Sequence, residues 1–158
     1  MRLILTLLFV VFCSINSIGQ SISISEMEKM SKMDADNFDS FIISKGYEFT
    51  ARTKESNYTI LTYDFSHNID ENRTRTITVG VGVPVLKNLS VSYETYDKDE
   101  YLKLKEEIIK LGYKSFDLES LHDHDGEGGV SFHYIKGKKV IKVLNQTRFF
   151  TLNVSELK

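Results

Sequence analysis

Two hydrophobic periodicities alternate along this chain, and their order predicts its secondary structure. In the first third, apolar residues recur every three or four positions, as they do on one face of a helix. After Tyr47, apolar and polar residues alternate, which is the period of a strand with one buried face. This pattern predicts two helices and then four strands: helices at 26–32 and 34–45, strands at 47–53, 58–66, 74–83 and 89–95.

The second half of the chain repeats this order. Asp97 and Glu100 form an N-terminal capping pattern, in which the side chains of both residues would bind backbone amides. Apolar residues then recur at three- and four-residue steps as far as Leu111, which predicts a helix that ends before Gly112. Four more strands are expected after this helix, at 114–121, 130–135, 139–145 and 149–154.

Two short segments match each other at an offset of 66 residues: Ile42-Ile43-Ser44-Lys45-Gly46-Tyr47 and Ile108-Ile109-Lys110-Leu111-Gly112-Tyr113. In both, a helical pattern ends in glycine, which tolerates the left-handed conformation after a helix, and an aromatic residue opens a strand. We therefore expect an α+β fold in which two tandem helix–antiparallel four-strand units, at about 25–95 and 98–157, pack as one compact domain.

This organisation resembles the tandem helix-plus-four-strand architecture of the β-lactamase inhibitor protein family. It is also similar to a broad group of uncharacterised exported bacterial proteins with a helix–Gly-Tyr–strand unit. The resemblance lies in the architecture of most of residues 25–157, and the chain departs from the inhibitor family in lacking its cysteine pairs. It implies an exported, inhibitor-like binding module.

The first nineteen residues have the layout of a secretory signal peptide. Arg2 is followed by an apolar run of about eleven residues, which is too short to cross a bilayer, and then by small and polar residues. Ser17 and Gly19 occupy the −3 and −1 positions of a cleavage before Gln20. We expect residues 1–19 to be removed and 20–158 to form a single periplasmic or secreted domain. The alternatives are an uncleaved anchor and a lipid anchor on Cys13.

Cys13 is the only cysteine, and it would leave with the signal peptide. An exported domain without disulfides favours a bacterial envelope, because small eukaryotic extracellular domains more often carry cysteine bridges. Five asparagines begin Asn-x-Ser/Thr triplets, which would be glycosylation sites in a eukaryotic secretory pathway and ordinary surface residues in bacteria. These are Asn57, Asn72, Asn88, Asn145 and Asn153.

Charge and hydropathy exclude two classes of partner. The whole chain has 20 basic and 22 acidic residues, and removal of Arg2 leaves a net charge of about −3. This balance offers no basic excess for binding nucleic acid. After the signal peptide, no segment is apolar enough to span a membrane.

One cluster has the residue types of a metal site. His122, His124 and Glu127 lie within His-Asp-His-Asp-Gly-Glu-Gly-Gly, and imidazole and carboxylate groups suit zinc or a harder divalent ion. The alternative is a polar turn between two strands, which the glycines and aspartates also favour. The metal interpretation would make the chain a small metal-binding or hydrolytic protein.

Catalytic patterns are otherwise missing, and the aromatic residues point to binding. There is no Gly-x-Ser-x-Gly motif, and no thiol remains after Cys13 is removed, so we expect neither an enzyme nor a cofactor. Several tyrosines fall on strands and would form an exposed surface for a protein or peptide of the cell envelope: Tyr58, Tyr63, Tyr93 and Tyr134. The alternatives are that they lie in the core, or that the protein is a structural subunit that pairs through an edge strand.

Overall fold

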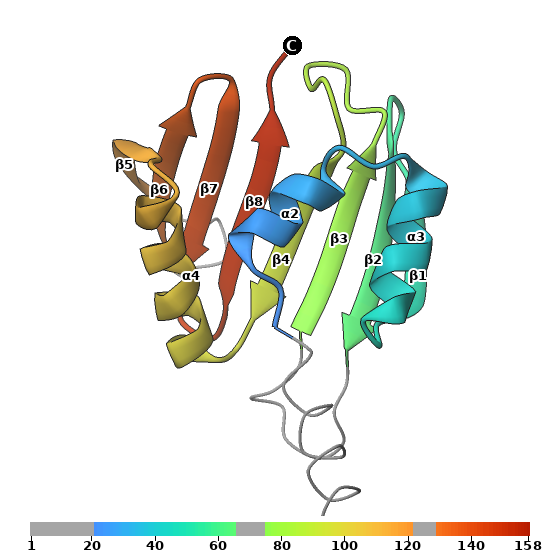
Figure 1. Cartoon of the computed structure of the whole chain (residues 1–158), viewed down its shortest axis with the longest axis horizontal. Helices are drawn as coiled ribbons and strands as arrows, with labels where there is room; N and C mark the ends of the chain where they lie inside the picture. The colour runs from blue at the N-terminus through green and yellow to red at the C-terminus, as the bar shows by residue number, and fades with distance from the viewer. Residues whose placement is uncertain (1–20, 66–74, 122–128) are drawn as a thin grey trace, which may run out of the picture.

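Three helices and one eight-stranded antiparallel sheet make up the described part of the chain (Figure 1). This computed structural model describes residues 21–65, 75–121 and 129–158. The helices and the strands segregate into two layers, with all three helices on the same face of the sheet (Figure 1). The expected α+β class is therefore confirmed.

The helices begin at short polar side chains that accept hydrogen bonds from otherwise unpaired backbone amides. Ser23 and Glu26 form a reciprocal capping box, while Asp34 and Asp97 cap the other two helices alone. Each predicted helix is present, with ends that differ from the expectation by at most two residues. The helices are α2 (Ile24–Met30), α3 (Ala35–Ser44) and α4 (Lys98–Lys110).

The glycines of the two matching segments end their helices in the same way. Gly46 and Gly112 have φ angles of 88° and 81°, a region that favours glycine because it has no Cβ. The amide of Tyr47 donates to the carbonyl of Ile42 at 3.3 Å, and the amide of Tyr113 makes the equivalent bond to Ile108 at 3.3 Å. Both helices thus end in a Schellman motif, followed by a buried tyrosine.

The strands form one continuous sheet in the order β1-β2-β3-β4-β8-β7-β6-β5. Neighbours in sequence pair antiparallel within each set of four, and β4 pairs with β8 to join the two sets. The sequence pattern places the strands to within two residues. They are β1 (Glu48–Lys54), β2 (Thr59–Phe65), β3 (Arg75–Val81), β4 (Ser90–Thr95), β5 (Lys114–Leu121), β6 (Gly129–Lys136), β7 (Lys139–Asn145) and β8 (Phe150–Glu156).

The two edge strands, β1 and β5, each contain a β-bulge. The pairing of β1 with β2 skips Thr50, and the pairing of β5 with β6 skips Phe116. A bulge twists the backbone of an edge strand and makes regular pairing with another sheet less favourable. Phe116 is 75% exposed at its bulge.

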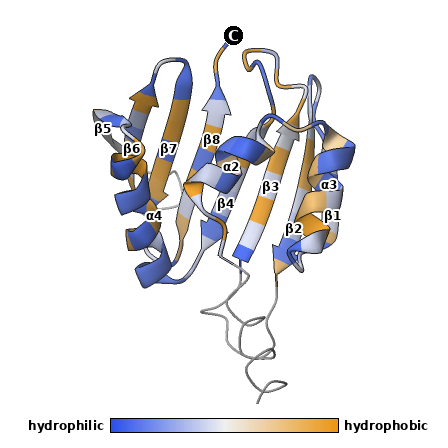
Figure 2. Ribbon diagram, viewed as in Figure 1, coloured by the Kyte–Doolittle hydropathy of each residue, from blue (hydrophilic) through white to orange (hydrophobic). Residues whose placement is uncertain are grey.

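The hydrophobic core lies between the helices and one face of the sheet. Alternate residues of each strand point to it, so apolar and more polar positions alternate along β3 (Figure 2). Phe38, Ile42 and Ile108 bring the apolar faces of α3 and α4 against this layer. Among the most deeply buried residues of the central strands are Tyr63, Ile77, Val79, Val91, Tyr93, Ile141, Val143, Leu152 and Val154.

A carboxylate on α4 enters this core instead of capping the helix. Glu100 accepts two hydrogen bonds from Nε of Arg75, at 2.9 and 3.2 Å, and one each from the hydroxyls of Tyr93 and Thr95, both at 2.8 Å. The expected capping box at Asp97 is therefore only half correct. The Asp97 side chain caps the helix, but its own amide donates to the Thr95 hydroxyl at 3.1 Å.

Candidate functional site

The candidate functional site is the face of the sheet that lies opposite the helices. All three helices lie on the other side, so no helix of the described residues covers this face (Figure 1). The pleat directs every second residue of each strand to this face, and on β2, β3, β4 and β8 most of these residues are short and polar. On the four strands β2, β3, β4 and β8 they are Ile60, Thr62, Asp64, Thr76, Thr78, Gly80, Ser90, Ser92, Glu94, Thr151, Asn153 and Ser155.

A shallow groove of about 320 Å³ lies at one end of this face. Its apolar wall comes from Tyr58, from Ile60 and from the connection between β3 and β4, which brings Val83 and Leu86 over the sheet. The remaining wall is polar and consists of the hydroxyls of Thr78, Ser90 and Ser92 and the amide of Asn153.

Gly80 forms the floor of this groove. A Cβ at this position would lie 3.1 Å from Cγ2 of Val83 and 3.5 Å from Cβ of Ser90, so the close approach of the β3–β4 connection depends on the absence of a side chain. The connection is also fixed at its far end, where the amide of Lys87 donates to the carbonyl of Glu156 at 2.8 Å. These two contacts hold the β3–β4 connection against the sheet, so the shape of the groove is set by the fold.

Two carboxylates lie at the opposite end of the same face. Asp64 on β2 and Glu94 on β4 flank Thr76 of β3, whose hydroxyl donates to Oδ1 of Asp64 at 2.7 Å. Burial raises the pKa of Glu94, and the nearby charge of Asp64 adds to this effect, while a hydrogen bond with Tyr96 opposes it. This end of the face favours a positively charged partner group.

Glu94→Gln should change how stability depends on pH. Because the folded-state pKa of Glu94 is raised above 4.5, its contribution to stability is present at low pH and is lost as the pH rises through the folded value. Glutamine stays neutral, so the stability of the variant relative to the wild type should increase between pH 4 and pH 7. Urea unfolding at several pH values measures this difference, and a difference independent of pH would contradict the expected cause.

A row of short polar side chains crosses the face beside the carboxylates, and three of its four members also line the groove. Thr62, Thr78, Ser92 and Asn153 are successive cross-strand neighbours on β2, β3, β4 and β8. The Asn153 amide donates to Oγ of Ser90 at 2.9 Å. Hydroxyl and amide groups both donate and accept hydrogen bonds, so this row can bind the polar surface of a partner.

Three of the four tyrosines proposed for a binding surface lie elsewhere. Tyr63, Tyr93 and Tyr134 are 1%, 0% and 4% exposed, on the sheet face that the helices cover. Residues this deeply buried are core residues, which corrects the expectation that they form an exposed patch. The physical reason is that eight strands join in one sheet, so the large side chains of both halves are needed beneath the helices. Only Tyr58 lies beside the candidate site.

The other candidates from the sequence lie outside the described residues. His122, His124 and Glu127 fall within 122–128, and the expected signal peptide and cleavage site fall within 1–20. In the described ranges, no group of three or more histidine, cysteine, aspartate or glutamate side chains is placed to hold a metal ion. Within the same ranges, none of the helices combines the length and the apolar character needed to cross a membrane.

Sequence reasoning missed most residues of the candidate site, although a signal for them was present. The alternation of β3 already placed Thr76 and Thr78 opposite Ile77 and Val79. Similar alternation around Ser92 and Asn153 would have extended the same face to two more strands. These residues become one surface only because β4 pairs with β8.

Comparison with known proteins identifies no relative of this chain. No protein-family model, no curated protein and no solved structure matches this chain. Its function has to be inferred from the fold and from the candidate site.

Proposed function

We propose that this protein is an exported, non-enzymatic binding module of the bacterial envelope, which holds a protein or a peptide on the uncovered face of its sheet. The observation that carries this proposal is that the three helices of the described residues all lie on one face, which leaves a groove, a polar row and two carboxylates together on the other (Figure 1). The resemblance to the β-lactamase inhibitor protein family points in the same direction.

The chemistry of the groove favours binding over catalysis. Within the described residues, its lining has one titratable side chain, that of Tyr58, beside hydroxyl, amide and apolar groups. Proton transfer in catalysis usually needs a titratable group whose pKa lies near neutral pH. Shape and hydrogen bonding, which suit a protein or peptide surface, are what this lining offers.

We further propose that the fold arose from two tandem units of one helical segment and four strands. The Schellman motifs at Gly46 and Gly112 lie 66 residues apart, and so do the bulges at Thr50 and Phe116. Each set of four strands pairs in sequence order and meets the other set through its last strand. A duplication accounts for both correspondences, because local sequence alone would not place two unrelated bulges at the same offset.

Ser92→Arg should greatly weaken the capture of the native partner. Ser92 lies in the middle of the polar row, where an arginine side chain would occupy the surface that the partner contacts. We expect a loss of at least about tenfold in captured partner, which is typical of a disruption at the centre of an interface. The measurement is affinity capture from an envelope extract, with quantitative mass spectrometry.

The matched control is Ser115→Arg. Ser115 is an exposed serine on β5, the edge strand farthest from β1, and it pairs with Tyr134 on the face that the helices cover. This variant introduces the same charge and volume and should capture as much partner as the wild type. Equal capture by the wild type and both variants would contradict the proposed function.

A further inference from the structure

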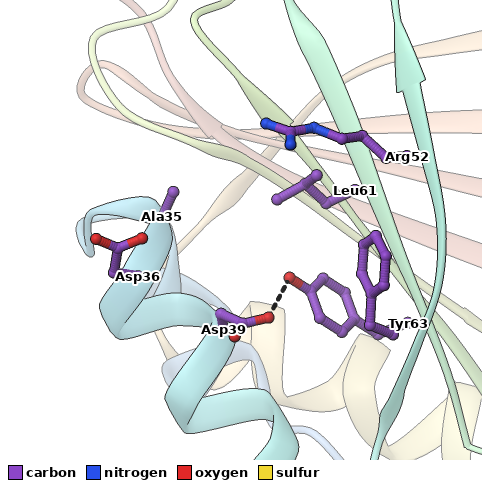
Figure 3. A pocket seen from close by; sticks show the side chains of 7 residues that line it. Ala35, Asp36, Asp39, Arg52, Leu61 and Tyr63 are labelled. Carbon is purple, nitrogen blue, oxygen red and sulfur yellow. Dashed lines mark hydrogen bonds between the residues drawn. The ribbon is translucent and has the colours of Figure 1, made fainter.

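A second concave site lies at the outer edge of the sheet, on the helix-covered side. It is a pocket of about 290 Å³ between α3 and the strands β1 and β2, separate from the groove on the uncovered face. Figure 3 shows that two carboxylates on α3 stand on one side of this pocket, and that Arg52 extends along the other side above Leu61. The lining residues are Ala35, Asp36, Asp39, Phe49, Arg52, Leu61 and Tyr63.

One carboxylate of the pocket is held in place by the core. The hydroxyl of Tyr63 donates to Oδ1 of Asp39 at 2.8 Å (Figure 3), and Tyr63 itself is buried. A fixed carboxylate binds a cation at a lower entropic cost than a freely moving one. In the described part of the chain, neither Asp36 nor Asp39 forms a salt bridge with a lysine or arginine.

An aromatic ring completes the pocket beside this carboxylate. Phe49 is 50% exposed, and its ring packs against that of Tyr63 at a centroid distance of 5.5 Å. An exposed ring next to fixed negative charge attracts a cation through its π-face, while Leu61 offers apolar contact to the stem that carries the cation. The lining therefore fits an ammonium or guanidinium group on an aliphatic chain.

The pocket opens along an unpaired strand. β1 is the last strand of the sheet, and within the described residues its outer edge pairs with no other strand. All seven of its residues are exposed. An extended peptide can add to such an edge through main-chain hydrogen bonds and direct alternate side chains toward one face. The bulge at Thr50 interrupts the register of β1 with β2, and regular pairing then continues from Ala51 to Lys54, the stretch that contains Arg52.

We propose that this pocket binds a lysine or arginine side chain of an extended partner segment that lies along β1. The cation contacts Asp39 and the ring of Phe49, and the guanidinium of Arg52 is placed to bind a carbonyl of the same segment. This inference rests on the proposed function, because it takes the partner to be a protein or peptide. It adds a second contact site and requires that the partner present a lysine or arginine side chain.

The test is a titration of the full chain with short capped peptides, followed by the chemical shifts of its backbone amides. One peptide alternates valine and threonine around a central lysine, and the other has norleucine in place of that lysine. We expect the lysine peptide to shift the amides of Phe49 and Arg52 and to bind at least about tenfold more tightly than the norleucine peptide. Equal affinities, or shifts that avoid the pocket, would overturn the inference.

Asp39→Asn tests the role of the charge. Asparagine keeps an oxygen that can accept the Tyr63 hydroxyl, so the fold is retained while the negative charge is lost. The variant should lose at least about fivefold in affinity for the lysine peptide and bind the norleucine peptide as before. The control is Asp99→Asn, which removes an acidic residue from the first turn of α4 and should change neither affinity. Unchanged binding of the lysine peptide by Asp39→Asn would overturn the inference.

A titration with a small molecule separates the contribution of the cation to binding from that of the extended segment. Capped lysine alone carries the same ammonium group but cannot pair along β1, so it should bind more weakly than the lysine peptide. Equal binding would overturn the part played by β1. Capture of the native partner distinguishes the two proposals, since loss of capture by Ser92→Arg but not by Asp39→Asn would support the uncovered face and exclude the pocket.

Discussion

Glu100→Ala should lower the free energy of unfolding by about 3–5 kcal/mol, because it leaves a partly buried guanidinium and the buried hydroxyls of Tyr93 and Thr95 without their carboxylate. The side chains of Arg75 and Glu100 are 17% and 8% exposed, and four hydrogen bonds converge on this carboxylate. Burial also raises the pKa of Tyr93, whose hydroxyl donates to Glu100. The loss is a large part of the total stability of an ordinary domain.

Urea unfolding measures this effect, and Glu106→Ala is the control. Glu106 lies on the same helix, its side chain is 70% exposed, and its ion pair with Lys110 is a surface contact. Removing it should cost less than about 1 kcal/mol. Similar losses for both variants would show that the carboxylate of Glu100 does not join α4 to the sheet.

Tyr63→Ser should have an effect of similar size, about 3–5 kcal/mol, because it empties a fully buried aromatic site. Tyr63 packs between the rings of Phe38 and Phe49, with centroid distances of 5.6 and 5.5 Å, and its hydroxyl binds Asp39. Tyr134→Ser should destabilise the protein for the same reason, since Tyr134 is 4% exposed. Both variants should show a lowered midpoint in thermal unfolding.

Tyr58→Ser is the informative comparison. Tyr58 lies beside the groove on the uncovered face and is only partly buried, so its replacement should cost less than about 1 kcal/mol. The same variant should weaken partner capture, because it removes the aromatic wall of the groove. Stable folding of Tyr63→Ser, or unfolding of Tyr58→Ser, would reverse the assignment of the two tyrosines to core and surface.

The local structure could be predicted from the sequence because it depends on neighbouring residues. Apolar residues at helical spacing, glycine after α3 and α4, and alternation along strands such as β3 are short-range signals, and they located every described helix and strand. The capping residues Asp34 and Asp97 act within one turn of their own helices. These elements follow from physical chemistry that spans only a few positions.

The candidate site could not be predicted in the same way, because it depends on long-range pairing. Alternation shows that Tyr63 and Thr62 point to opposite faces, but it does not show which face the helices cover. The position of the helices settles that question (Figure 1), and the join between β4 and β8 brings Asn153 beside Ser92. Glu100 likewise fits a capping pattern in the sequence, and only the fold shows that its carboxylate binds Arg75.

The most direct test of the proposed function is photo-crosslinking from single cysteines in a Cys13→Ser background, which removes the chain's only natural thiol. A benzophenone maleimide is attached at Ser92→Cys on the uncovered face or at Ser115→Cys on the edge strand β5, and the labelled protein is irradiated in an envelope extract. We predict a specific adduct with a partner protein from the Ser92 position and none from the Ser115 position. Adducts from Ser115 alone, or equal adducts from both, would contradict the assignment of the uncovered face as the binding surface.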